Sequence, residues 1–79
     1  MKIPRDVSGA RLAGVLCRNW QYARVHQVGS HIILETAQPT HHRIAIPDHQ
    51  ALRLGTFNSI LRAVAQHKGV QRDEIIAGL

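Results

Sequence analysis

The sequence predicts an α+β fold in which helices pack on one face of a three-stranded antiparallel sheet. Three observations support this prediction: a capped stretch of helical periodicity near the start, strand-like segments separated by Gly and Pro in the middle, and an amphipathic stretch after them. The expected order is helix, three strands, helix and a short final helix. Such a layout leaves the second face of the sheet open to solvent.

The first helix is expected over about residues 9–18. Ser8 precedes it and is a suitable N-cap, because a serine hydroxyl accepts a hydrogen bond from a free backbone N–H of the first turn. Apolar side chains then recur at helical spacing, at Leu12, Val15 and Leu16. One side of this helix should therefore pack on the rest of the chain.

Three strands are expected next, over about residues 22–27, 30–37 and 41–46. The first two should form a hairpin with its turn at Val28-Gly29, because glycine readily adopts the positive φ angle of a tight turn. Pro39 indicates a second turn at residues 37–40, since proline cannot donate to a central ladder, and Pro47 should end the third strand. One face of that strand carries His42, Ile44 and Ile46, and the other carries His41 and Arg43.

The second helix is expected to start at Thr56, its N-cap, after a loop over residues 48–55. Its apolar residues form one stripe at positions i, i+3, i+4 and i+7, namely Phe57, Ile60, Leu61 and Val64. Gly69 should end this helix, and a short helix over about 71–77 follows. Since this length suits one hydrophobic core, residues 1–79 are treated as a single domain.

The composition is typical of a globular domain with an excess of positive charge. Hydrophobic residues make up 44% and charged residues 19%, and ten Lys and Arg against five Asp and Glu give a net charge of +5. This balance suits a polyanion or an acidic protein partner. No apolar run approaches the roughly 18 residues that span a membrane, and the opening MKIPRDVSG lacks a signal-peptide core, so a cytoplasmic location is expected. The one cysteine, Cys17, excludes an internal disulfide and a cysteine-based zinc site.

Several short motifs together carry a family resemblance. They are PRDVSG at 4–9, HQVGSH at 26–31, HH at 41–42, IPDH at 46–49, LRLGTFNSIL at 52–61 and VQRDEII at 70–76. In this order, and over nearly the whole chain, they resemble the HicA family of bacterial and archaeal toxin ribonucleases. The resemblance implies a fold like that of the double-stranded-RNA-binding domain. His26 and Val28 stand at two positions where the family is commonly basic.

The resemblance also implies a function. HicA proteins are toxins of type II toxin–antitoxin systems that cut messenger RNA, arrest translation and are neutralised by a HicB-type antitoxin in a hetero-oligomer. They need no cofactor or metal. The catalytic residue of the family is the histidine of the Gly-Ser-His motif, which is His31 here.

The chemistry of histidine fits this role. Cleaving RNA without a metal needs a base that takes the 2′-hydroxyl proton and an acid that protonates the departing 5′-oxygen. Imidazole can do either, since its ordinary pKa is about 6.5. If Ile32 and Leu34 pack on the helices, alternation places His31 on the open face with Ile33 and Glu35. The opposite assignment, or a solvent-facing histidine without function, remains the alternative.

Other residues are candidates for assisting His31 or contacting RNA. These are Gly29 and Ser30 in the turn, His49 and His26, and Arg24, Arg43 and Arg53. His49 could be a second proton-transfer group, a phosphate contact or a loop anchor. No metal site is expected, because the six histidines show no recognised ligand spacing.

Two rival functions compete with the ribonuclease. One is a non-catalytic RNA-binding module of the same fold, which would bind RNA through basic side chains and would not need His31. The other is a protein-interaction domain that acts only as one component of a complex. Cleavage of RNA by the isolated protein discriminates the enzyme from both.

Overall fold

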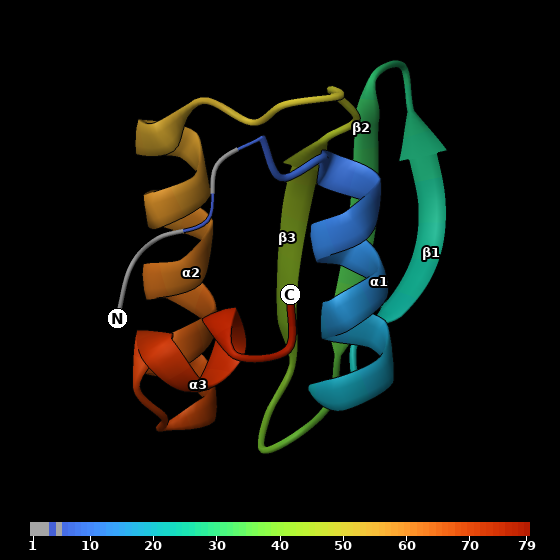
Figure 1. The fold of residues 1–79 in the computed structure, drawn as a ribbon. Helices are drawn as coiled ribbons and strands as arrows, with labels where there is room; N and C mark the ends of the chain where they lie inside the picture. Colours follow the sequence, from blue (N-terminus) through green and yellow to red (C-terminus); the bar gives the residue numbers. More distant parts are fainter. Residues whose placement is uncertain (1–3, 5) are drawn as a thin grey trace.

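Two helices cover one face of a three-stranded sheet and run in the same direction (Figure 1). A computed structural model describes residue 4 and residues 6–79 of the chain. Its elements are α1 (Gly9–Asn19), β1 (Ala23–Val28), β2 (His31–Thr36), β3 (His42–Pro47), α2 (Leu54–Lys68) and α3 (Arg72–Ile76). The α+β fold and the order of its elements are thereby confirmed. In the PRDVSG motif, Arg5 lies outside the described residues, as do the first three residues of the chain.

Helix α1 begins as the sequence predicts. The Ser8 hydroxyl accepts a hydrogen bond of 3.0 Å from the backbone N–H of Arg11. The side of α1 that faces the sheet is buried, and its buried residues are Gly9, Leu12, Ala13, Val15 and Leu16. Cys17 is a free cysteine on the same helix, packs beside the core and is only partly buried.

The sheet is antiparallel with strand order β1-β2-β3, so β2 has a hydrogen-bonded neighbour on both sides. Ile32 and Leu34 of β2 point into the core and are 1% and 0% exposed. Because side chains alternate along a strand, His31 points to the opposite, open face. The structure thereby determines which face His31 points to, which the sequence pattern alone does not decide.

The strand boundaries differ slightly from the prediction. The turn lies at Gly29-Ser30, one residue later than expected, because Val28 still pairs with His31 in the ladder. Gly29 has a φ of +57°, as a tight turn requires. Pro47 is the last residue of β3 and pairs with His31, which is possible because β3 is an edge strand.

Helix α2 begins three residues earlier than predicted. Its N-cap is Arg53, in an extended conformation, and the Phe57 N–H donates to the Arg53 carbonyl over 2.9 Å. Thr56 therefore lies inside the first turn, and the prediction of Thr56 as N-cap is wrong. A side-chain cap is not needed here, because Leu54 and Gly55 of the first turn are exposed and water can satisfy free N–H groups at a helix end. The predicted apolar stripe is confirmed, and Gly69 ends the helix with φ at +69°.

The core lies between the sheet and the helices, with α3 closing its lower end (Figure 1). Ile75 and Ile76 of α3 are buried there, at 0% and 6% exposed. A capping box holds α3, in which the Glu74 carboxylate accepts a hydrogen bond of 2.7 Å from the Gln71 backbone N–H. Burial of these isoleucines is what attaches the short helix to the body of the protein.

The start of α1 is packed directly against the end of β3. The Gly9 N–H donates to the His49 carbonyl over 2.9 Å, and a Cβ atom at position 9 would overlap the carbonyl oxygen of Pro47. Farther along, the Leu52 N–H donates to the Val7 carbonyl over 2.8 Å. The segment after β3 is therefore held in place by the first residue of α1 and by Val7, which precedes this helix.

Adding a methyl group at this contact should destabilise the protein. We expect Gly9→Ala to lower the free energy of unfolding by about 1–3 kcal/mol, since Pro47 is backbone-restrained and cannot yield cheaply. Gly14→Ala is the control: its Cβ would meet only the flexible end of Arg18. Removing this glycine from the helix interior should stabilise the protein by up to about 1 kcal/mol. Urea denaturation measures both, and equal midpoints for Gly9→Ala and wild type would contradict the packing.

Candidate functional site

His31 occupies the first position of the central strand, on the open face of the sheet. Its Cα partners are Val28 on β1 and Pro47 on β3, so ladders on both sides hold its backbone. Its side chain is exposed and has no hydrogen-bond or ion-pair partner within the part of the chain that the structure describes. A backbone held on both sides and a free imidazole together make His31 available to an external ligand.

Backbone and side-chain hydrogen bonds join the hairpin turn to the segment after β3. The Asp48 N–H donates to the Ser30 carbonyl over 2.6 Å. The Gln27 amide nitrogen donates to the Asp48 carboxylate over 3.2 Å and to the Gly29 carbonyl over 3.3 Å. HQVGSH and IPDH, which are separate motifs in the sequence, thus form one structure around His31. We call it the turn junction, residues 27–31 and 47–49.

The sequence alone indicates no role for Gln27 or Asp48. Both residues lie inside the motifs HQVGSH and IPDH, which the sequence does single out. One sequence does not show that these two motifs are in contact. Ser30 contributes its backbone carbonyl to the junction, and Gly29 contributes both its turn conformation and a carbonyl. His49 is exposed and anchors α1 through its carbonyl oxygen. This contact is made by the backbone, so the three roles considered for the His49 side chain remain predictions.

A chain of polar contacts crosses the open face beside His31. Arg43 donates to His26 Nε2 over 3.3 Å, and its Nε lies 3.8 Å from the Glu35 carboxylate. Glu35 also accepts a hydrogen bond of 2.9 Å from His41 Nε2, which holds the pKa of that carboxyl below its ordinary value. We call these four side chains the open-face network. The network flanks Ile33, which is only 7% exposed although it faces away from the helices.

His26 belongs both to this network and to the surroundings of His31. It pairs with Ile33, and His31 pairs with Val28, so the two histidines are diagonal neighbours on the same face. Such neighbours have Cα atoms about 7–8 Å apart, within reach of aromatic side chains. Arginine is a donor only, so His26 Nε2 accepts from Arg43 and carries no proton in this arrangement. The structure therefore brings His26, His31 and Arg43 to one face.

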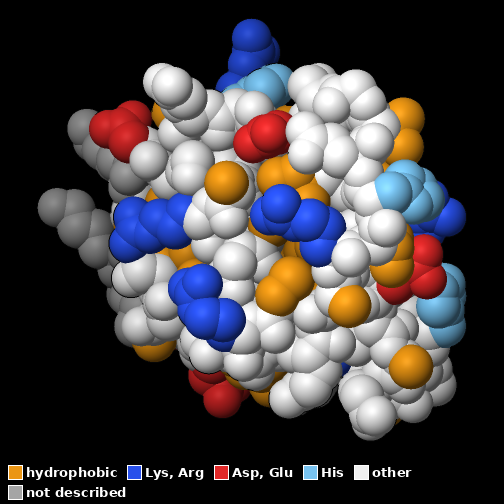
Figure 2. All heavy atoms as spheres, turned by 90° about the vertical axis from the view of Figure 1, so that its right-hand side faces the viewer, with side chains coloured by type: hydrophobic (Ala, Val, Ile, Leu, Met, Phe, Trp, Pro, Cys, Tyr) orange, Lys and Arg blue, Asp and Glu red, His pale blue; other side chains and the backbone are white. Residues whose placement is uncertain are grey.

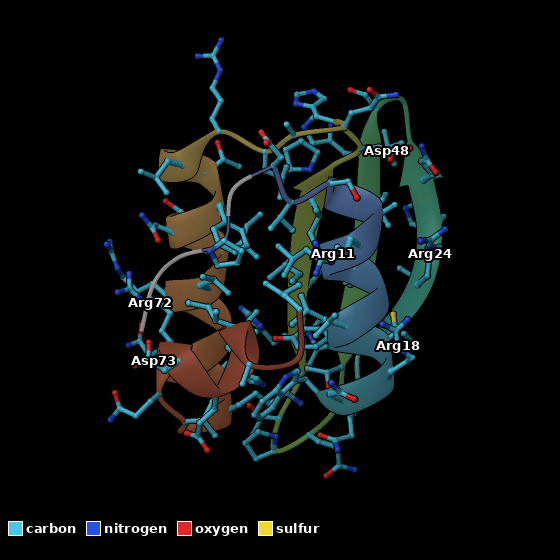
Figure 3. All side chains as sticks on the ribbon, in the orientation of Figure 1. Arg11, Arg18, Arg24, Asp48, Arg72 and Asp73 are labelled. Carbon is cyan, nitrogen blue, oxygen red and sulfur yellow. The ribbon has the colours of Figure 1, made fainter. Side chains whose placement is uncertain are left out.

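The other predicted arginines lie elsewhere. Arg24 pairs with Leu34, so it belongs to the side of the sheet that α1 covers, and its exposed side chain lies near α1 (Figure 3). Arg53 is exposed at the start of α2, in the helical layer. Neither is brought to the open face with His31.

A second group of histidines lies at the opposite end of the sheet, about 17 Å along β2 from His31. The His42 ring stacks on His67 with centroids 4.4 Å apart, and its Nδ1 is 2.7 Å from the Tyr22 hydroxyl. His67 Nε2 donates to the Thr40 carbonyl over 2.9 Å. Lys68 lies over the Tyr22 ring, 5.0 Å from its centroid.

Burial shifts the pKa values of side chains in this second group. It lowers the pKa of His42, and the neighbouring His67, His41 and Lys68 lower it further. Burial also lowers the pKa of Lys68 and raises the pKa of Tyr22 to about 12. His42 and His67 line a shallow surface pocket with Ala63 and Gln66. Because these rings are engaged with their neighbours, we assign them to packing rather than to the site of His31.

Among the described residues, no three His, Cys, Asp or Glu side chains are grouped so that they could hold a metal ion. No helix in that part of the chain has the length and apolar character needed to cross a membrane. Comparison of the chain with protein-family models, curated proteins and solved structures finds no match. The resemblance to HicA proteins therefore rests on the motifs and their order.

The His42 cluster should make stability depend on pH. The pKa of His42 is lower in the folded chain than its ordinary 6.5, so the unfolded chain binds this proton more readily. Its stabilising contribution is present above pH 6.5 and is lost as the pH falls through the folded-state pKa. We expect the free energy of unfolding to decrease from about pH 7 to about pH 5, and to decrease less in His42→Asn. Urea titrations across this range test it, and an equal decrease in both proteins would contradict it.

Proposed function

We propose that the protein is an endoribonuclease of the HicA kind, which cuts messenger RNA by proton transfer through His31 and without a metal. The observation that carries this proposal is the placement of His31. It is exposed on the open face, its backbone is held by β1 and β3, and no described side chain occupies its ring. An RNA strand lying on this face would meet a free imidazole at a fixed position.

A second imidazole is within reach for the second proton transfer. In this mechanism Arg43 leaves His26 for a phosphate of the RNA, because a charge-assisted contact to phosphate is stronger than its contact to a neutral ring. His26 Nε2 then takes the 2′-hydroxyl proton as the 2′-oxygen attacks the adjacent phosphorus. His31 gives a proton to the 5′-oxygen as the P–O bond breaks. The products are a 2′,3′-cyclic phosphate and a 5′-hydroxyl, and exchange with water restores both histidines.

The proposed activity also implies a cellular location and a protein partner. The toxin would act in the cytoplasm, where messenger RNA is translated, and would require a HicB-type antitoxin to neutralise it. An antitoxin lying over the open face would cover His31 and His26 together. The net charge of +5 suits an acidic antitoxin surface.

One observation favours a second candidate, the non-catalytic RNA-binding module. No described residue forms a hydrogen bond with His31 that would orient its ring, whereas catalytic histidines commonly have such a partner. In this candidate His31 would contact RNA without transferring a proton. RNA that binds and is recovered intact after long incubation would favour it over the enzyme.

Removal of the His31 imidazole should abolish cleavage without unfolding the protein. We expect His31→Ala to lower the cleavage rate of a messenger RNA by at least about 10²–10⁴-fold, the usual contribution of a positioned proton donor or acceptor. Expression of this variant should no longer arrest growth. His67→Ala, at the far end of the sheet, is the matched histidine control and should retain activity. Full toxicity of His31→Ala, with circular dichroism like that of wild type, would refute the assignment.

The pH profile tests the role of His26. With two histidines in opposite protonation states, the cleavage rate should be bell-shaped in pH. His26→Gln keeps a hydrogen-bonding side chain next to Arg43 but cannot take the proton. We expect a lower rate and loss of the acidic limb, on which His26 must lose its proton. A profile with both limbs intact would show that another group acts as the base.

A further inference from the structure

Three arginines gather on the side of the molecule formed by α1 and β1. Arg11 and Arg18 lie on α1, seven residues and about 10 Å apart along the helix axis, and Arg24 lies on the neighbouring strand β1. All three side chains are exposed. Figure 3 shows them on one side of the molecule, and Figure 2 shows Lys and Arg side chains gathered on this face. We call Arg11, Arg18 and Arg24 the arginine patch.

The packing of Arg18 draws the patch together. A Cβ atom at Gly14 would lie 3.0 Å from Arg18 Nη1, so the guanidinium folds back over the helix by one turn. This direction is toward Arg11, which lies three residues before Gly14. The absence of a side chain at Gly14 leaves room for the guanidinium there. Arg11 and Arg18, seven residues apart, therefore carry like charges on the same side of α1.

Among the described residues, no carboxylate forms an ion pair with the patch. Arg43, in contrast, has Glu35 beside it, and Arg72 donates to the Asn58 side chain over 3.3 Å. Like charges placed together without a counter-charge raise the free energy of the isolated protein, and a bound anion removes that cost.

We propose that the arginine patch binds backbone phosphates of the RNA strand whose cleavage site lies at His31. This inference rests on the proposed function and assigns to it a binding surface on a different side of the molecule. The strand would cross the edge of β1, all six residues of which are exposed. Arg24 pairs with the core-facing Leu34, whereas His26 and His31 lie on the open face, so β1 separates the patch from these histidines. A flexible single strand can follow such a path around one β-strand.

The chemistry of the patch favours RNA over an acidic protein. A stable protein interface needs an apolar or aromatic centre in addition to charge. On β1 beside the patch the large exposed hydrophobic residues are Val25 and Val28, with no exposed aromatic ring among them. Guanidinium groups bind phosphate oxygens through two parallel hydrogen bonds, and they need no apolar partner to do so.

The salt dependence of RNA binding tests the proposal separately from cleavage. The probe is a 20-nucleotide single-stranded RNA with 2′-O-methyl groups, which lacks the attacking hydroxyl and stays intact. Each phosphate contact to a single strand contributes about 0.7 to the slope of log K against log salt. Arg11→Gln/Arg18→Gln should therefore reduce that slope by about 1.4, and adding Arg24→Gln should reduce it by a further amount of about 0.7.

The control removes the same charge from elsewhere. Arg62→Gln/Arg72→Gln also lowers the net charge from +5 to +3. Arg62 lies on α2, and Arg72 of α3 lies on the side of the molecule opposite the patch (Figure 3). We expect this control to leave the slope nearly unchanged. Equal slopes for the two double variants would overturn the proposal. It would also be overturned if the patch variant bound RNA normally and lost only the binding of an acidic protein. Cleavage of unmodified RNA by wild type is read in parallel, so failure of the ribonuclease function is seen as a separate result.

Discussion

The whole arrangement depends on the position of β2 between two hydrogen-bonded neighbours. Ladders on both sides fix its register, and the burial of Ile32 and Leu34 fixes which face points to the helices. A slip of one residue would put these two side chains in water and would bury His31, at a cost of several kcal/mol. The same hydrophobic burial that stabilises the sheet therefore determines the direction of His31. Fold and candidate site are specified by one constraint.

Local polar contacts give this arrangement further support. The turn junction places Asp48 against the hairpin turn, and Gly9 attaches the same segment to α1. The end of the sheet that carries His31 is thus supported from the hairpin, from β3 and from a helix. The opposite end, with the His42 and His67 stack, is engaged in packing. This division explains how six histidines in one small domain can have different roles.

The sequence was sufficient to predict the features that depend on periodicity. These include the order of elements, the apolar stripe of α2, the Ser8 cap and the positive φ of Gly29. The sequence was not sufficient to predict where α2 starts. A helix whose first N–H groups are accessible to water needs no capping side chain, so Thr56 does not mark its start. Contacts between segments that are distant in the chain could not be predicted from the sequence either. The bond from Arg43 to His26 and the fold of Arg18 over Gly14 depend on strand register and side-chain direction, which one sequence does not contain.

In the proposed mechanism, imidazole groups on the open face cut RNA by transferring protons. The most direct measurement is the chemistry of the new ends after RNA is incubated with the wild-type protein in excess EDTA. We expect cleavage that continues in EDTA and yields 2′,3′-cyclic phosphate and 5′-hydroxyl ends. RNA that remains intact, or 3′-hydroxyl and 5′-phosphate ends that form only when a metal is restored, would contradict it.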